Sequence, residues 1–191
     1  MLYLKNSISR LRNRNGCWTK PVNVVVASRR AIDAIDVRIR ITGTSLAIRG
    51  CEANEIVKGF LWLGRGSFAC DEKKLKRAGI THVLTVANDT PDVVRAVRSH
   101  SETFHHKVLE VGDFGTDEGI YRVFKEALVF FQSVSDTESG KVFVHCANGS
   151  NRSPTIVVAY LMASLKMSLK DAYATVMSRR PHIMILKDNR E

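Results

Sequence analysis

The sequence predicts an α/β fold in which a central, largely parallel sheet is flanked by helices. Short apolar runs alternate with longer amphipathic stretches, an alternation typical of parallel sheets. Hydrophobic residues make up 45% and charged residues 25% of the 191 residues, as in soluble globular proteins. The segment from Val142 to Thr155 also joins a short strand to a long apolar helix through a loop that contains a glycine.

The elements are expected in a definite order. Strands are expected at 60–63, 82–87, 107–111 and 142–144, and helices at 71–78, 120–134, 155–165 and after Ser168. Gly79 is a normal C-terminal stop for the first helix. The apolar residues of 120–134 recur at helical spacing, and Ser168 with Asp171 resembles a capping box at the start of the last helix.

Charge divides the chain near residue 50. Residues 1–50 hold ten Lys/Arg and two acidic residues, a net charge of +8, whereas residues 51–191 hold nineteen and seventeen, a net charge of +2. We therefore expect a basic extension at 1–50, with one candidate strand at 37–41, and one domain at 51–191. A basic arm can bind nucleic acid, acidic lipid or an acidic partner, and it can equally be a solvated tail.

The first thirty residues bear on localisation. They hold seven basic residues and no acid, and Leu4, Ile8 and Leu11 share one helical face, which is the composition of a mitochondrial targeting segment. An ordinary basic tail has the same composition, so we expect a cytoplasmic protein and keep the mitochondrion as the alternative. No apolar run approaches the roughly 20 residues of a membrane-spanning helix.

The cysteines and histidines show no metal pattern. Cys17, Cys51, Cys70 and Cys146 lack the paired spacing of zinc sites, and the six histidines are dispersed. The sequence predicts no metal and no cofactor.

The segment around Cys146 carries the chemistry. Cys146 lies between a strand end and a helix start, where backbone N–H groups and the helix dipole favour a thiolate. Gly149 lets the loop bend so that its N–H groups point inward, and Arg152 can grip two oxygens of an anion side by side. Ser153 is expected as the N-cap, with Pro154 at the first helical position. A thiolate beside an anion cradle predicts attack on phosphorus.

The motif His-Cys-x-x-Gly-x-x-Arg-Ser at 145–153 resembles the signature of the cysteine-dependent protein phosphatases. The continuation Ser-Pro-Thr-Ile-Val-Val-Ala-Tyr-Leu-Met is similar to the small dual-specificity branch, as are the segments 61–64 and 78–86. The resemblance covers about 53–183. It implies the cysteine-phosphatase fold and metal-independent hydrolysis of phosphotyrosine and phosphoserine or phosphothreonine in proteins.

The resemblance also implies roles for single residues. Cys146 is the nucleophile that forms a phosphocysteine intermediate, Arg152 binds phosphoryl oxygens, and Ser153 donates to the sulfur as it leaves. His145 orders the loop and points away from the phosphate. The residues that bind the substrate together with Arg152 are Ala147, Asn148, Gly149, Ser150 and Asn151.

The general acid is expected from an Asp on a loop before the signature. Asp113 follows the strand expected at 107–111 and lies 33 residues before Cys146. Asp117 stands in the same loop and is the alternative. Asp117 also suits the start of the helix that follows, where the dipole favours an acid.

The resemblance limits the substrate as well. The domain has no room for the segment that deepens the pocket of tyrosine-only phosphatases, so a shallow pocket is expected. The loop residues before Arg152 carry no charge, which disfavours a phosphoinositide. The implied partner is a phosphorylated protein, and a kinase that docks on Arg29-Arg30 with Ile32 and Ile35 is an open candidate.

Two other functions stay open. Asn151 before Arg152 resembles the signature of RNA 5′-triphosphatases, and a basic arm would suit RNA. A non-catalytic phosphate-binding module is the third reading, although such proteins typically lose the Cys or the Arg. One departure from the family concerns the C-terminus, where only ten residues follow Pro181. We expect the family's last helix to be missing, shortened or altered there, with no effect on catalytic residues.

Overall fold

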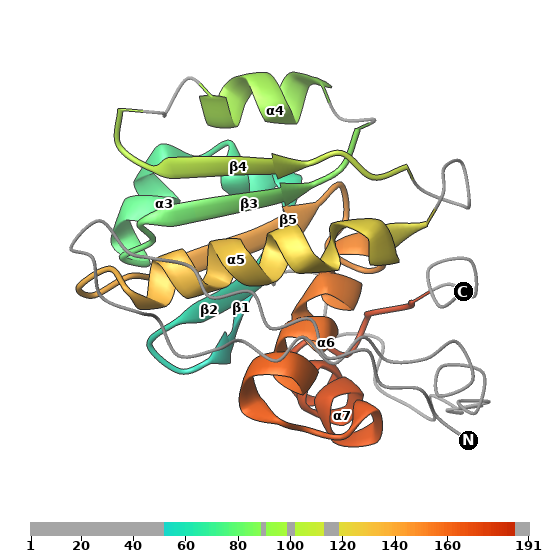
Figure 1. The fold of residues 1–191 in the computed structure, drawn as a ribbon. Helices are drawn as coiled ribbons and strands as arrows, with labels where there is room; N and C mark the ends of the chain where they lie inside the picture. The colour runs from blue at the N-terminus through green and yellow to red at the C-terminus, as the bar shows by residue number, and fades with distance from the viewer. Residues whose placement is uncertain (1–51, 89–90, 99–101, 113–118, 186–191) are drawn as a thin grey trace.

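The computed structural model describes residues 52–88, 91–98, 102–112 and 119–185. Five strands form one sheet in the order β1-β2-β5-β3-β4 (Figure 1). They are β1 Ala53–Val57, β2 Leu61–Arg65, β3 His82–Val86, β4 His105–Leu109 and β5 Val142–Cys146. β1 pairs antiparallel with β2, and the other three pairings are parallel, so the predicted largely parallel sheet is confirmed.

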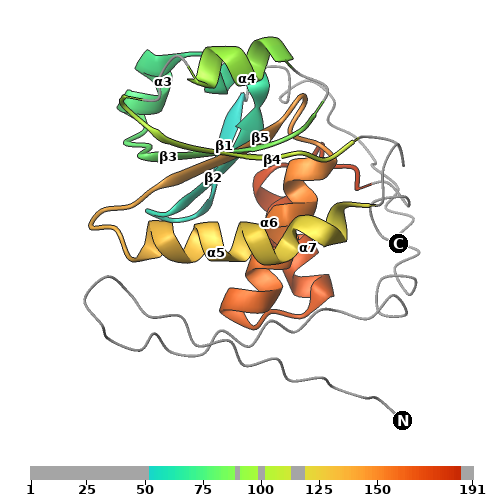
Figure 2. The same ribbon diagram turned by 45° about the horizontal axis from the view of Figure 1, so that its top comes forward.

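Helices cover both faces of this sheet (Figures 1 and 2). One face carries α2 Gly66–Ala69, α3 Glu72–Arg77 and α4 Pro91–Arg98. The other carries the 3-10 helix η1 Ile120–Val123 together with α5 Phe124–Ser135, α6 Arg152–Leu165 and α7 Leu169–Arg179. The larger apolar core lies under α5, α6 and α7, and a smaller one around Phe143 lies under the other helices. The central strand β5 is therefore buried on both faces along its whole length.

The N-terminal strand β1 and the helices α2 and α4 were not expected from the sequence. β1 forms a hairpin with β2 through a turn in which the Phe60 N–H donates to the Val57 carbonyl at 3.0 Å. Only Ile56 of β1 is buried, so the strand lacks the apolar alternation that identifies strands in a sequence. The strand expected at 60–63 is β2, which begins one residue later and ends two residues later, from Leu61 to Arg65.

Two other predicted boundaries were wrong. β4 begins and ends two residues before the expected 107–111, because its first residue, His105, already bonds through its N–H to the Thr81 carbonyl at 3.0 Å. The helix expected at 120–134 starts with a separate 3-10 turn, and α5 proper begins at Phe124.

Several expectations fall outside the described residues. These are the basic extension at 1–50 with its candidate strand, targeting segment and docking residues, and the two candidate acids Asp113 and Asp117. The domain boundary at residue 50 therefore stays a prediction. Among the helices that the structure describes, none is long and apolar enough to cross a membrane.

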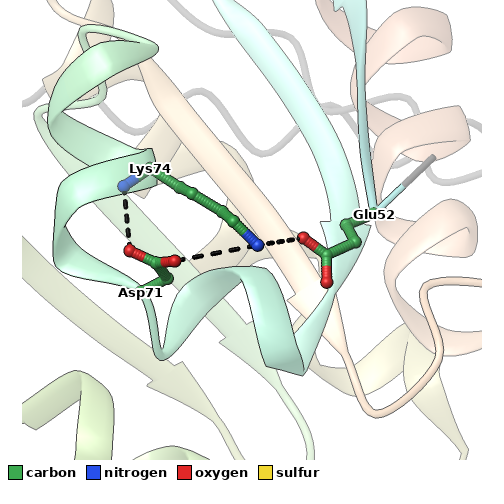
Figure 3. A network of polar contacts seen from close by, with 3 residues as sticks. All are labelled: Glu52, Asp71 and Lys74. Carbon is green, nitrogen blue, oxygen red and sulfur yellow. Dashed lines mark hydrogen bonds and ion pairs between the residues drawn. The ribbon is translucent and has the colours of Figure 1, made fainter. Parts of the chain in front are cut away.

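A polar network connects α3 to the start of the β1 segment. Asp71 caps the helix, accepting from the Lys74 N–H at 3.0 Å, and the Lys74 ammonium reaches back to Glu52 at the start of the β1 segment (Figure 3). The cap bond from Lys74 lowers the pKa of Asp71 below its ordinary value. These side chains are partly exposed, so the ion pair adds little stability, and the network chiefly fixes where α3 begins.

Candidate active site

The loop 147–151 follows the central strand at the carboxyl edge of the sheet. Cys146 ends β5 and Arg152 begins α6, so the two residues flank this loop. Gly149 has a φ of +65°, and a Cβ at this position would lie 2.2 Å from the Gly64 carbonyl oxygen of β2. Both the left-handed backbone and the close approach require glycine here, as the motif predicted.

Each carbonyl from Cys146 to Ser150 contacts a hydrogen-bond donor outside the loop. The contacts are His145 Nδ1 to Cys146 O at 3.2 Å, Gly66 N–H to Ala147 O at 3.0 Å, Arg180 to Asn148 O at 3.2 Å and to Gly149 O at 2.8 Å, and Met184 N–H to Ser150 O at 2.7 Å. In a trans peptide the N–H points opposite to the carbonyl. Five successive carbonyls held outward therefore turn the N–H groups of residues 147–151 to the inner side of the loop.

Cys146 lies at the base of this loop. Its side chain is 3% exposed, and the Ser153 hydroxyl donates to its sulfur at 3.3 Å. Ser153 is itself fully buried in the first turn of α6. The sulfur thus lies beside a hydroxyl donor and close to the N-terminus of a helix.

The helix starts earlier than predicted, and Ser153 is not its N-cap. Asn151 occupies the cap position, and its carbonyl accepts from the N–H of Thr155 at 3.1 Å and from the Thr155 hydroxyl at 2.9 Å. Pro154 lies inside the first turn, where a missing N–H leaves no helical bond unmade. Because Asn151 takes the cap position, the Ser153 hydroxyl is left for the sulfur.

Arg152 projects from the first residue of α6 and is 1% exposed. Its Nη1 donates to the Val111 carbonyl at 3.3 Å, which connects the end of the β4 segment to the loop. Val111 is close in sequence to Asp113. The candidate acid itself lies outside the described residues, so its position stays a prediction.

His145 is completely buried, and its ring stacks on Phe143 and contacts the neighbouring strand β3. Its Nε2 lies 2.8 Å from the Thr85 hydroxyl of β3, and this hydroxyl lies 2.8 Å from Nε2 of His106 in β4. Burial lowers the pKa of His145 to about 4, and burial with the charge of Arg98 lowers that of His106 to about 4. Both imidazoles are therefore neutral at neutral pH.

Two arginines, Arg65 and Arg180, lie on the outer side of the loop. Arg65, at the end of β2, donates to the Asn148 side-chain oxygen at 3.3 Å. Burial first, and then the charges of Arg180 and Arg65, hold the pKa of His182 below its ordinary value. Such a surround favours an anionic ligand over a neutral one.

A family model for the catalytic domain of dual specificity phosphatases matches residues 61–187. The chain belongs to this family. Its relatives include dual specificity protein phosphatase 1 of Arabidopsis thaliana, which is 33% identical over 147 residues, covering 77% of this chain and 70% of that protein. Mpk3 of Drosophila melanogaster is 33% identical over 129 residues, or 68% of this chain. The chain spans only 30% of the length of Mpk3.

Solved structures agree with this membership. The human tyrosine phosphatase-like serine/threonine/tyrosine-interacting protein superposes with a TM-score of 0.59 at 28% identity, over 72% of this chain and 90% of that one. Human DUSP28 superposes with a TM-score of 0.63 at 22% identity, over 73% and 88%, and shows the fold alone. The resemblance seen in the signature and the expected cysteine-phosphatase fold are thus confirmed.

The segment after α7 of this dual specificity phosphatase domain contacts the loop. It was expected to touch no catalytic residue, and the contacts that Arg180 and Met184 make are to three carbonyls of the expected substrate-binding residues, those of Asn148, Gly149 and Ser150. Arg180 is fully buried, and its Nη1 also donates to the Asn54 side chain of β1 at 2.7 Å. The Arg180-Pro181 pair was visible in the sequence. Its position gave no sign that it contacts a loop about thirty residues earlier.

Proposed function

We propose that this chain is a phosphatase that hydrolyses phosphotyrosine and phosphoserine or phosphothreonine in proteins through a phosphocysteine intermediate. One observation carries the proposal, namely a buried cysteine sulfur, 3.3 Å from a hydroxyl donor, beneath a loop whose successive N–H groups face inward. Membership of the dual specificity phosphatase family supports it.

The proposed chemistry has two displacements. The Cys146 thiolate attacks phosphorus, the bond to the substrate oxygen breaks, and Asp113 gives this oxygen a proton. Water then attacks the phosphocysteine and gives a proton to the Asp113 carboxylate, and the sulfur–phosphorus bond breaks to release phosphate and the Cys146 thiolate. The Ser153 hydroxyl stabilises the departing thiolate, while Arg152 and the inward N–H groups bind the three equatorial oxygens in both steps.

The substrate class follows from the surroundings of the loop. Ala147, Asn148, Ser150 and Asn151 carry no charge, so a single phosphate is better matched than a polyphosphorylated headgroup. Arg65 beside Asn148 offers one cation at the rim, which suits an acidic residue flanking the phosphorylated side chain. A phosphorylated kinase is the candidate partner, and its docking residues are proposed in the basic extension.

Two variants test the mechanism. Cys146→Ser is expected to abolish turnover and to keep phosphopeptide binding, because the alcohol is a poor nucleophile while the loop is unchanged.

Arg152→Lys is expected to lose most activity, because the charge stays and the two-pronged contact is lost. Steady-state kinetics and calorimetry measure these outcomes. Parent-like turnover in Cys146→Ser would end the cysteine mechanism.

A substrate panel separates the alternatives. Phosphotyrosine and phosphothreonine peptides and triphosphorylated RNA are compared at equal enzyme concentration, with and without EDTA. We expect both peptides to be hydrolysed, the RNA to be inert, and EDTA to have no effect. Turnover of the RNA alone would assign the triphosphatase function, and binding without any turnover would assign a phosphate-binding module.

A further inference from the structure

Three polar side chains link β4 and β3 to the base of the site. His106, Thr85 and His145 lie on neighbouring strands in the order β4-β3-β5, and adjacent members are joined at 2.8 Å. Thr85 and His145 are both fully buried. The series ends at the Cys146 carbonyl, 3.2 Å from His145 Nδ1.

The direction of each hydrogen bond follows from donor and acceptor capacity. A carbonyl oxygen only accepts, so Nδ1 of His145 carries the proton that is donated to Cys146. A neutral imidazole has one N–H, which leaves Nε2 of His145 as an acceptor, and the Thr85 hydroxyl therefore donates to it. The single hydroxyl proton is then used, so Thr85 accepts from Nε2–H of His106.

The hydrogen bond from His145 to the Cys146 carbonyl orients the peptide group between Cys146 and Ala147. Holding the Cys146 carbonyl outward turns the Ala147 N–H inward, beside the Cys146 side chain. The opposite tautomer of His145 would place two acceptors, Nδ1 and the carbonyl oxygen, against each other. The buried hydroxyl of Thr85 excludes that tautomer only while it donates its proton to Nε2 of His145. A donor at His106 keeps the proton in this direction, because the Thr85 oxygen then accepts from His106.

We propose that Thr85 and His106 are positioning residues for Cys146, His106 donating to Thr85 and Thr85 to His145, so that His145 keeps its proton on Nδ1. The inference rests on the proposed function only in that it explains the reactivity of the same cysteine. His106 reaches the site through two other side chains and touches no substrate. Arg98 of α4 and His145 are the charged and titratable groups that face His106.

The first test reads the tautomers directly. Long-range proton–nitrogen spectra of the protein labelled at its six histidines distinguish protonated from bare ring nitrogens. We expect Nδ1–H at His145 and Nε2–H at His106 in the parent, and a mixture of tautomers at His145 in Thr85→Val. Nε2–H at His145 in the parent would overturn the proposal. This readout does not depend on turnover, so it stands apart from the fate of the proposed function.

The second test measures the reactivity of the Cys146 thiol. We expect Thr85→Val and His106→Leu to lower the rate of Cys146 alkylation by iodoacetamide at pH 6 by about three- to tenfold, the range for one lost hydrogen bond.

Conservative variants and a neighbouring histidine complete this test. Thr85→Ser keeps the hydroxyl and His106→Gln keeps a donor at the Nε2 position, so both should alkylate at the parent rate at pH 6. His105→Gln alters the adjacent exposed residue, which stacks on His82 instead, and serves as the matched control. Parent-like alkylation of Thr85→Val at pH 6, or an equal loss in Thr85→Ser, contradicts the positioning role.

Discussion

The Ser153 hydroxyl is buried in a helical turn and directed at the Cys146 sulfur. In most helices a serine at this end caps the backbone, and here Asn151 holds the cap position instead. The hydroxyl is thus available to a sulfur that must accept negative charge when a phosphocysteine breaks down. We therefore propose that Ser153 acts mainly in the second displacement.

Removing that hydroxyl should slow one step selectively. We expect Ser153→Ala to lower kcat by about ten- to a hundredfold, the range for a lost hydrogen bond to a charged group, and to leave the first displacement fast. A burst of leaving group followed by slow turnover in rapid-mixing experiments would show this. Ser178→Ala on the exposed face of α7 is the control. An equal slowing of burst and turnover would contradict the assignment.

Asp113 is the proposed general acid, with Asp117 as the alternative. Asp113→Asn is expected to lower kcat on alkyl phosphates by about two orders of magnitude and to matter little for substrates with good leaving groups. Asp117→Asn should show no such dependence on the leaving group. A plot of log kcat against leaving-group acidity for each variant measures it. If only Asp117→Asn shows the dependence, the two roles are exchanged.

The elements differ in how far the sequence predicts them. β3 and β5 were predicted because every residue in each is buried and most of these residues are apolar. β1 was missed because the hairpin buries one side chain of five, and α4 because its eight residues are too few for a sustained helical repeat. The site residues Cys146 and Arg152 follow from local spacing. Thr85, Arg180 and Met184 reach the loop only through tertiary contacts, which no local pattern reports.

Arg180, which follows α7, is expected to be essential for anion binding. Arg180→Met keeps the length of the side chain and removes every donor, which leaves the carbonyls of Asn148 and Gly149 without this partner. We expect the affinity for vanadate, measured as a competitive inhibition constant, to fall at least about tenfold. Arg179→Met at the exposed neighbouring position is the matched control. Unchanged vanadate affinity in Arg180→Met would show that the loop keeps its shape without this contact.

At the scale of the whole molecule, the buried imidazoles make stability depend on pH. The pKa of His145 falls from an ordinary 6.5 to about 4, mainly through burial, and that of His106 falls similarly. Between these values the unfolded chain binds protons that the folded one does not, so stability is full above pH 6.5 and is lost as pH falls toward 4. For the fully buried His145 the loss amounts to about 3 kcal/mol.

Urea unfolding between pH 7.5 and 5 measures this dependence. We expect the free energy of unfolding to fall steadily with pH in the parent and more gently in His106→Gln, which removes one titrating group. His105→Gln on the exposed side of the same strand should follow the parent. A flat profile in the parent would mean that the buried imidazoles take up protons in the native state.

The outward anchoring of the loop carbonyls has a thermodynamic consequence. The anchors come from positions as distant as Gly66 and Met184, so the loop acquires its shape only when the whole sheet and α7 are assembled. An oxyanion then meets a receptor that is already ordered and binds the native state alone. By linkage, an oxyanion at about a hundred times its Kd should raise the free energy of unfolding by about 2.7 kcal/mol. Thermal denaturation in the presence of phosphate, tungstate or vanadate thus becomes a binding assay that requires no knowledge of the physiological substrate.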